Sequence, residues 1–361
     1  MIISYHNIHN KFKLNGLYYN RQQLKTVAYN YIKEGADYEK ITGHFLLNWL
    51  DDNDHIFVKT SGSTGPPKTI KLLKSAMVNS AIATGVFFNL KPSDTALHCL
   101  PTDYIAGKMM LVRALILGLE IDCVKPSTQL SFNFEKHYHF CAMIPLQVQH
   151  SLQKTKQIKT IIIGGSKVSD SLLKQIKNCN SLFYETYGMT ETVTHIAVRQ
   201  LQSKAAKAQR YFNALPKVKF TQDDSDCLII EAPNVSDKLI MTNDCVDLKS
   251  QTQFQLLGRV DNVINSGGVK LFPEQIEKKL QPHIKVRFFI ASTKDAHLGE
   301  KLILVIENSE ASLDIIMNII SELKTLDKFE IPKKIYTLKT FIETSTGKIQ
   351  RKKTLNAIFG S

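Results

Sequence analysis

Apolar positions along this chain alternate between two kinds of pattern. Helical patterns cover 21–33, 38–50, 74–88 and 106–117, and short apolar runs typical of strands lie over 94–99, 120–124, 140–144, 159–163 and 181–185. Asn15–Gly16, between two short apolar segments, indicates a hairpin turn. The alternation predicts an α/β fold, in which helices cover the faces of a sheet and ligands bind at the strand ends.

The pattern changes in the second half of the chain. From about 211 to 257 the helical pattern stops, and short strands with polar turns replace it, which predicts an added β subdomain. A length of 361 residues exceeds what one core usually serves, so two domains are expected.

One short segment has the composition of a phosphate-binding loop. It follows the apolar run 56–58 and consists of Thr60, Ser61, Gly62, Ser63, Thr64, Gly65, Pro66, Pro67 and Lys68. Glycines let backbone N–H groups approach an anion, hydroxyls add donors, and lysine adds charge. A kinase-type P-loop requires glycine directly before its lysine, and Pro67 occupies that place.

Further motifs follow this loop in a fixed order, at 161–166, 184–192, 239–244, 258–264, 266–277 and 344–351. In this order they resemble the adenylate-forming acyl- and aryl-CoA synthetases. The resemblance implies a large α/β domain over 1–257, with its β subdomain at about 211–257, and a small mobile α+β lid over 258–361. The family carries a larger N-terminal subdomain before the loop, so an N-terminally short version is expected.

The resemblance also implies roles for individual residues. Lys348 would stabilise charge as the carboxylate attacks the α-phosphate, Thr190 would contact that phosphate, and Glu191 would hold Mg2+. Further ATP contacts are assigned to Gly164, Gly165, Tyr187, Gly188, Asp244 and Arg259. In this set Tyr187 would stack on adenine, and Asp244, after an apolar strand, would accept hydrogen bonds from the ribose. Asp261 would be the hinge of the lid, and Gly267 and Gly268 would approach the CoA arm. Pro273 independently predicts a helix start.

Arg113 is the residue that most strongly indicates which acid is the substrate. It lies in a helical pattern that is apolar on nearly every side, so its charge must reach solvent or find an anion. The o-succinylbenzoate–CoA ligases of menaquinone synthesis have an arginine at a similar offset, which pairs with the carboxylate that is not activated. Tyr104 stands where those ligases have a histidine, and could close the acyl pocket as an aromatic gate.

Composition and charge disfavour several other classes of function. The net charge of +13 is spread through the chain, with 29 Lys/Arg against 21 Asp/Glu up to 257 and 17 against 12 beyond it. This favours attraction of small polyanions over a nucleic-acid groove. The six cysteines are widely spaced, which predicts buried free thiols. The N-terminus lacks the pattern of a signal peptide and no apolar run reaches membrane-spanning length, so a cytoplasmic protein without membrane insertion is expected.

The resemblance, on the residues that carry it, implies an AMP-forming acid–thiol ligase that uses ATP, Mg2+ and CoA, with o-succinylbenzoate as the acid. Three alternatives stay open at this point: another acyl- or aryl-CoA ligase, a nucleotide-binding homologue without the reaction, and a nucleic-acid-binding protein. A homodimer is an open alternative to a monomer.

Overall fold

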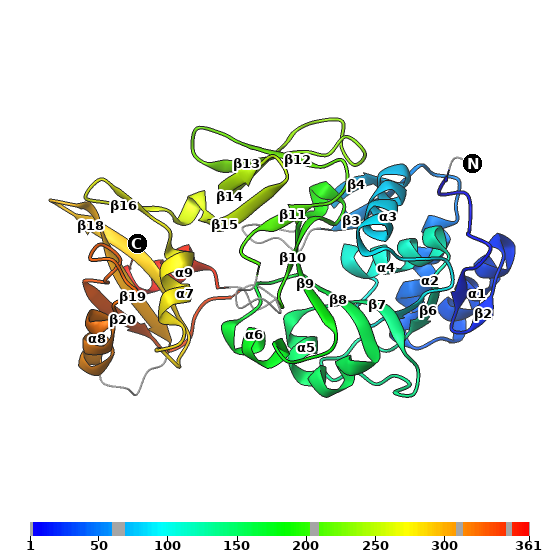
Figure 1. Ribbon diagram of the computed structural model, residues 1–361, viewed down its shortest axis with the longest axis horizontal. Coiled ribbons are helices and arrows are strands. Elements are labelled where there is room, and N and C mark those ends of the chain that lie inside the picture. The colour runs from blue at the N-terminus through cyan, green and yellow to red at the C-terminus, as the bar shows by residue number, and fades with distance from the viewer. Residues whose placement is uncertain (1–2, 60–68, 203–208, 308–312, 344–348, 361) are drawn as a thin grey trace.

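The computed structural model describes residues 3–59, 69–202, 209–307, 313–343 and 349–360. Within these residues, thirteen strands form one continuous sheet in the order β12-β13-β14-β15-β11-β10-β9-β8-β7-β5-β6-β1-β2. Figure 1 shows helices packed beside this sheet and a smaller group of strands and helices at the opposite end from the N-terminus. The predicted α/β fold class is confirmed.

The parallel part of the sheet contains β1 (Lys13–Leu14), β6 (Glu120–Cys123), β5 (Thr95–His98), β7 (Tyr138–Met143), β8 (Ile158–Ile163) and β9 (Leu182–Gly188). At its edge, β2 (Leu17–Tyr18) pairs antiparallel with β1. Asn15 and Gly16 both have positive φ, of 51° and 82°, so the predicted hairpin turn is confirmed. A separate two-stranded sheet pairs β3 (His55–Lys59) with β4 (Thr69–Leu73).

Four helices of this part match the predicted ranges to within one residue at each end: α1 (Arg21–Glu34), α2 (Asp37–Trp49), α3 (Lys74–Phe88) and α4 (Ile105–Leu117). The helices α5 (Pro145–Ser151) and α6 (Asp170–Ile176) and a 3-10 turn, η1 (Leu152–Gln157), complete this part. α3 and α4 are apolar all round because both are buried. Their buried residues share one core with α1 and α2.

The predicted β subdomain consists of β11 (Phe212–Ala214), β12 (Lys219–Gln222), β13 (Cys227–Glu231), β14 (Ile240–Ser250) and β15 (Gln253–Arg259). It is an extension of the main sheet, because β10 (His195–Gln200) pairs with β9 and β11, and β11 pairs with β15. One prediction is wrong in detail: Asp244 lies inside β14 and does not follow a finished strand. The two bulges along the β14–β15 pair break the alternation that would have revealed a strand of this length.

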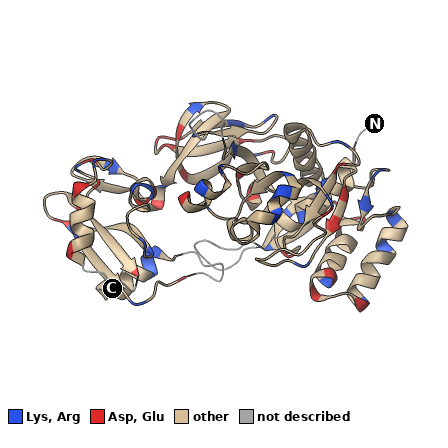
Figure 2. Cartoon of the chain, turned by 60° about the horizontal axis from the view of Figure 1, so that its bottom comes forward, with Lys and Arg blue, Asp and Glu red and all other residues tan. Residues whose placement is uncertain are grey.

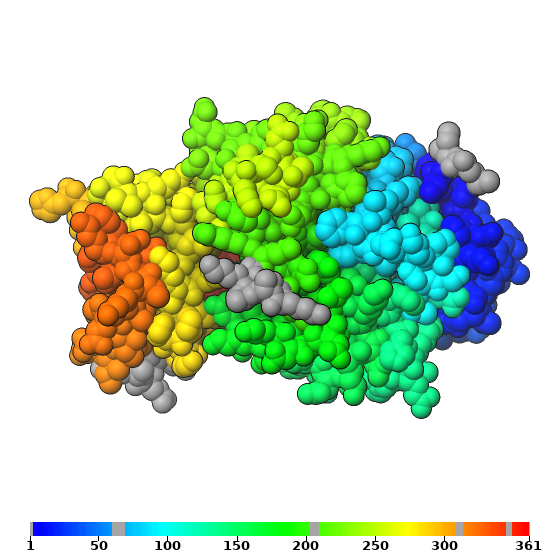
Figure 3. Space-filling model, viewed as in Figure 1, coloured from blue at the N-terminus to red at the C-terminus, as the bar shows by residue number. Residues whose placement is uncertain are grey.

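The C-terminal residues form a second sheet. Its strands are β16 (Ile264–Ser266), β17 (Val269–Leu271), β18 (Phe288–Asp295), β19 (Gly299–Glu307) and β20 (Lys334–Leu338), with α7 (Pro273–Leu280), α8 (Leu313–Glu322) and α9 (Arg351–Phe359). Figure 3 shows this part as a distinct block at one end of the molecule. Buried apolar residues up to Phe254 and from Ile264 on belong to separate clusters. The boundary at 257/258 stays a prediction, and β15 crosses it by two residues.

Charge and cysteine placement agree with the sequence. Figure 2 shows basic and acidic residues interspersed over both parts of the chain. All six cysteines are free thiols, and four of them, Cys99, Cys141, Cys227 and Cys245, are buried. None of the helices in the described part of the chain has the length and apolar character that crossing a membrane requires.

A buried lysine anchors the start of α3 and supplies a stability prediction. The Lys74 side chain is fully buried, and its Nζ lies 2.7 Å from Asp51 Oδ1, whose side chain is 37% exposed. Asp51→Asn leaves the ammonium buried without its counter-charge and should cost about 3 kcal/mol of unfolding free energy. Lys74→Met leaves a carboxylate that water can reach and should cost less. Chemical denaturation of both variants tests this, and an equal or reversed order of the two losses would contradict it.

Candidate active site

The predicted site residues gather where four adjacent parallel strands end. β5, β7, β8 and β9 are neighbours in the sheet, so their carboxyl ends share one edge. The segment that leads to Tyr104 follows β5, the pair Gly164–Gly165 follows β8, and Thr190–Glu191 follows β9. This is the edge at which open α/β sheets bind ligands.

Part of the predicted site lies outside the described residues. This concerns the phosphate-loop residues Thr60, Ser61, Gly62, Ser63, Thr64, Gly65 and Lys68, and the predicted catalytic Lys348. The apolar run before the loop lies within β3, and β4 begins directly after the loop at Thr69. The roles of these residues stay predictions.

Four of the predicted residues form one chain of polar contacts. The Tyr187 hydroxyl donates to Asp244 Oδ2 at 2.6 Å, and Arg259 Nη1 donates to Asp244 Oδ1 at 3.2 Å. Arg259 Nη2 donates to Asp261 Oδ2 at 3.3 Å. Burial and the Asp244 carboxylate raise the pKa of Tyr187, so this phenol stays a proton donor. The predicted adenine, ribose and hinge residues are therefore physically connected.

Asp244 supplies a prediction for nucleotide binding. Asp244→Asn removes the negative charge that receives the Tyr187 and Arg259 hydrogen bonds, and charge-assisted bonds are about twice as strong as neutral ones. The KM for ATP should rise about tenfold with little change in kcat. Asp247→Asn is the matched control, because Asp247 lies on the same strand and, among the described residues, its carboxylate accepts from the Tyr211 hydroxyl alone, at 3.3 Å. Equal KM values for the two variants would contradict the assignment.

The glycines after β8 and at the end of β9 fill different steric roles. Gly165 has φ of +87°, which favours glycine, and a Cβ at Gly164 would lie 2.7 Å from Thr186 Oγ1. At Gly188 a Cβ would lie 2.3 Å from the Thr194 carbonyl oxygen and 2.6 Å from the His195 Cα. Gly188 is therefore required for the close approach of the chain after Glu191.

Thr190 and Glu191 lie in a short 3-10 turn, η2 (Thr190–Thr192), at the end of which the chain reverses sharply. Val193 has φ of 65° and ψ of −56°, and the Thr194 N–H donates to the Thr192 carbonyl at 2.7 Å. This is a γ-turn of the strained hand, at a β-branched residue that the core holds in place. Glu191, before this turn, is exposed, whereas Thr194 is half-buried and His195 is buried.

Arg113, on α4, is buried at 1% exposure and does not reach solvent. Its Nε lies 3.3 Å from Thr84 Oγ1, and its Nη2 lies 3.4 Å from both Thr194 Oγ1 and His195 Nδ1. Among the described residues no carboxylate pairs with it. Burial lowers the pKa of Arg113 to about 9, so it keeps its charge at neutral pH. Tyr104, directly before α4, is half exposed.

Sequence reasoning missed the partners of Arg113. Thr84 comes from α3, 29 residues before Arg113, and His195 from the start of β10, 82 residues after it. The available signal was a histidine at the head of the apolar run 196–198, which a strand buried on both faces would not be expected to carry. The pair Glu185–Arg199, an ion pair between β9 and β10, was missed in the same way.

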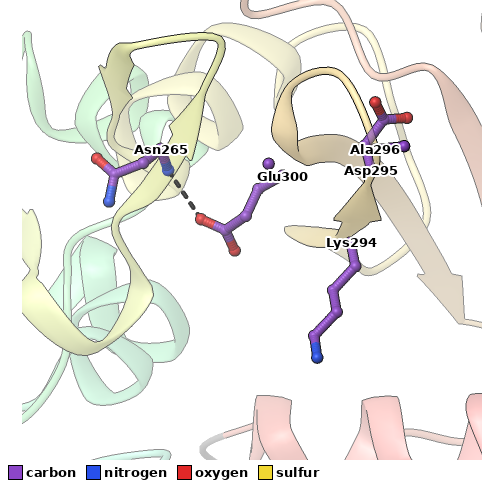
Figure 4. A pocket seen from close by; sticks show the side chains of 6 residues that line it. Asn265, Lys294, Asp295, Ala296 and Glu300 are labelled. Carbon is purple, nitrogen blue, oxygen red and sulfur yellow. Dashed lines mark hydrogen bonds between the residues drawn. The ribbon is translucent and has the colours of Figure 1, made fainter.

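The predicted CoA-side loop is a two-residue turn between β16 and β17. Gly267 and Gly268 both have positive φ, of 57° and 80°, and a Cβ at Gly268 would meet nothing within 4 Å. The turn therefore has open space beside it. A shallow pocket of about 750 Å³, lined by Asn265, Lys294, Asp295 and Glu300 among others, lies close by. Figure 4 shows Glu300, which accepts from the Asn265 N–H, between Asn265 and the pair Lys294 and Asp295. α7 begins with Pro273, as predicted.

Comparison with known proteins decides the family. The model of the family described as AMP-binding enzyme matches residues 23–221, more than half of the chain. The chain belongs to the AMP-binding enzyme family. An acyl-CoA synthetase (AMP-forming)/AMP-acid ligase II-like protein from Dyadobacter fermentans is 33% identical, with a TM-score of 0.61, over 92% of this chain and 98% of that one. The sequence prediction of an AMP-forming CoA ligase family is confirmed.

Relatives of known name lie within the same family. The 2-succinylbenzoate–CoA ligase of Enterococcus faecalis is 24% identical over 327 residues, which cover 81% of this chain and 67% of the relative. The o-succinylbenzoate CoA synthetase of Bacillus subtilis, solved with ATP and magnesium, is 19% identical with a TM-score of 0.71, over 83% of this chain and 69% of that one. The chain thus spans about two thirds of the length of these two relatives. At 19% identity, the similarity to the Bacillus structure shows a shared fold.

Proposed function

We propose that this protein is an AMP-forming ligase that couples a carboxylic acid to CoA. In the first step the substrate carboxylate attacks the α-phosphate of ATP, which releases pyrophosphate and gives an acyl-adenylate. In the second step the CoA thiol displaces AMP. The 60–68 loop and Lys348 would stabilise the developing charge in the first step. The lid over 258–361 would then turn at Asp261 and bring Gly267 and Gly268 toward CoA.

The residues present fit a magnesium ion bound mainly by substrate. Mg2+ is usually held by one or two carboxylates together with phosphates and water, not by a full set of protein ligands. Glu191 is an exposed carboxylate at the carboxyl edge of the sheet, and no three acidic, histidine or cysteine side chains converge elsewhere in the described residues. The ion would neutralise phosphate charge when bound, and Glu191 would hold it beside Thr190.

The substrate assignment depends on Arg113. A guanidinium that is nearly fully buried is costly unless an anion neutralises it, and the described partners of Arg113 are neutral. Two of its partners, Thr194 and His195, follow Glu191 by three and four residues, and this proximity supports placing the far carboxylate of the substrate at Arg113 while the other end is activated. A dicarboxylic acid satisfies both requirements. The names of the Enterococcus and Bacillus relatives support o-succinylbenzoate as that acid.

The test is AMP and pyrophosphate release from MgATP, with and without CoA. We expect turnover with o-succinylbenzoate, a CoA thioester as product, and strong losses in Glu191→Gln and Lys348→Ala. Equal turnover of benzoate or fatty acids would leave the ligase in place and refute the dicarboxylate. Absence of pyrophosphate release with any acid would refute the enzyme and favour a nucleotide-binding homologue.

A further inference from the structure

The group around Arg113 is defined by four side chains: Arg113 itself, Thr84, Thr194 and His195. We call it the arginine cage. Three segments that are distant in sequence contribute to it, namely α3, α4 and the turn that leads into β10. Thr84 is fully buried, and His195 is 5% exposed. Each of the three partners is a neutral group that can accept a hydrogen bond from the guanidinium.

Counting hydrogens fixes the direction of each contact. The Thr84 hydroxyl has one hydrogen, and it donates this to the Ser80 carbonyl at 2.9 Å. Toward its other two neighbours Thr84 Oγ1 must therefore accept, from Arg113 Nε at 3.3 Å and from His195 Nε2 at 3.4 Å. His195 then carries its hydrogen on Nε2. Its Nδ1 is left as an acceptor, 3.4 Å from Arg113 Nη2.

The protonation state of His195 agrees with this count. Burial and the neighbouring Arg113 charge lower the pKa of His195 well below its ordinary value, so the ring is neutral at physiological pH. A protonated ring would place an N–H against the guanidinium and repel it. The neutral ring instead receives one N–H of Arg113 and donates to Thr84, which links the two partners to each other.

A cage of neutral acceptors orients the guanidinium without cancelling its charge. A carboxylate in place of His195 would form an internal ion pair, as Glu185 does with Arg199, and would compete with any incoming anion. The cage contacts are 3.3–3.5 Å long, near the upper limit for a hydrogen bond, and no described residue accepts from Arg113 Nη1. The orientation is thus fixed, and the charge stays available.

We propose that His195 and Thr84 are positioning residues that hold Arg113 ready for the second carboxylate of the substrate, and so determine the preference for a dicarboxylic acid. This inference rests on the proposed function. It adds that the preference belongs to a three-residue unit and not to the arginine alone. His195 follows Glu191 by four residues, and the strained turn at Val193 lies between them. The turn therefore connects this unit to the residue that is proposed to hold Mg2+ at the activation end of the site.

The test compares paired variants on two acids. His195→Leu and Thr84→Val remove the acceptors, whereas His195→Gln and Thr84→Ser keep a group that can both donate and accept. We expect the first pair to raise the KM for o-succinylbenzoate about tenfold with kcat nearly unchanged. The second pair should keep this KM close to the wild-type value. With a monocarboxylate analogue that lacks the carboxylate that is not activated, KM should stay the same in all four. Thermal unfolding identifies any variant that fails to fold. If a variant of one residue does not fold, the variants of the other residue decide the test.

The outcomes separate the two proposals. A wild type that does not prefer the dicarboxylate refutes the proposed substrate, and this inference with it. If the wild type prefers the dicarboxylate, and this preference is lost in Arg113→Met but kept in His195→Leu and Thr84→Val, the inference alone is refuted. Equal KM changes for both acids would also overturn it, since they indicate a general loss of structure. Ring nitrogen chemical shifts of His195 give an independent readout: the neutral Nε2–H form is expected, and an imidazolium or an Nδ1–H ring would overturn the cage.

Discussion

Arg113→Met is expected to make the protein more stable and at the same time to raise the KM for o-succinylbenzoate by about thirtyfold or more. Methionine has a similar length and no charge, so it fills the same space in α4. Losing one partner of a desolvated charge pair costs about 2–5 kcal/mol of binding free energy, which is the origin of the KM effect. The KM for ATP should not change, because the proposed nucleotide-binding residues Asp244 and Arg259 belong to a separate chain of hydrogen bonds.

The gain in stability follows from the same burial. Holding an ion in the protein interior costs several kcal/mol, and Arg113 has no described counter-ion to offset that cost. Against this, the substitution leaves the His195 acceptor unsatisfied, at about 1–3 kcal/mol. The long cage contacts contribute little by themselves, so a net gain of about 1 kcal/mol is expected. A residue that weakens the fold and is needed for one substrate class is typical of a binding site.

Arg199→Met is the matched control for this prediction. Arg199 is also an arginine of low exposure, but it pairs with the buried carboxylate of Glu185. Its removal leaves that carboxylate uncompensated and should lower stability. Denaturation of both variants gives the comparison, with opposite signs expected. If Arg113→Met is destabilised as much as Arg199→Met, the cage holds the arginine for structural reasons, and the substrate assignment loses its main support.

Local signals in the sequence predicted local structure well, because one or two residues decide the outcome. Asn15 and Gly16 both have positive φ, as the predicted hairpin turn requires, and Pro273 begins a helix, as predicted. The order of helices and strands from Arg21 to the end of β9 was also largely predictable, since most of these elements have an apolar pattern of their own. The resemblance to CoA synthetases supplied the order of motifs, which no single pattern contains.

Contacts between distant segments were not predictable from these patterns. His195 and Thr84 meet Arg113 only because α3, α4 and β10 pack together, and nothing in the spacing of these residues encodes that meeting. Similarly, the β subdomain continues the main sheet through β11, a strand of three residues whose pattern is too short to recognise. The sequence identified Arg113 as a charge in an apolar helix but did not decide whether its side chain reaches solvent. The packing of the surrounding helices and strands buries it.

Gly188→Ala is expected to lower kcat/KM by at least about a hundredfold, because it acts on the turn and the arginine cage together. The new methyl group would overlap backbone atoms of Thr194 and His195, and backbone cannot move aside as a flexible side chain can. The displaced segment begins three residues after Glu191 and contains two of the cage side chains. A shift of about 1 Å at such a position can cost about a hundredfold in rate. Both the adenylation step and the preference for the dicarboxylate should suffer.

Gly43→Ala separates this effect from a simple loss of stability. A Cβ at Gly43 would lie 2.5 Å from the Ala28 carbonyl oxygen, an equally severe overlap with backbone, but between α1 and α2. Both variants should lose about 1–3 kcal/mol of stability. Assayed well below their unfolding temperatures, Gly43→Ala should keep the kcat/KM of the wild type and Gly188→Ala should not. Comparable activities in the two folded variants would mean that the segment from Glu191 to His195 does not position the reacting groups.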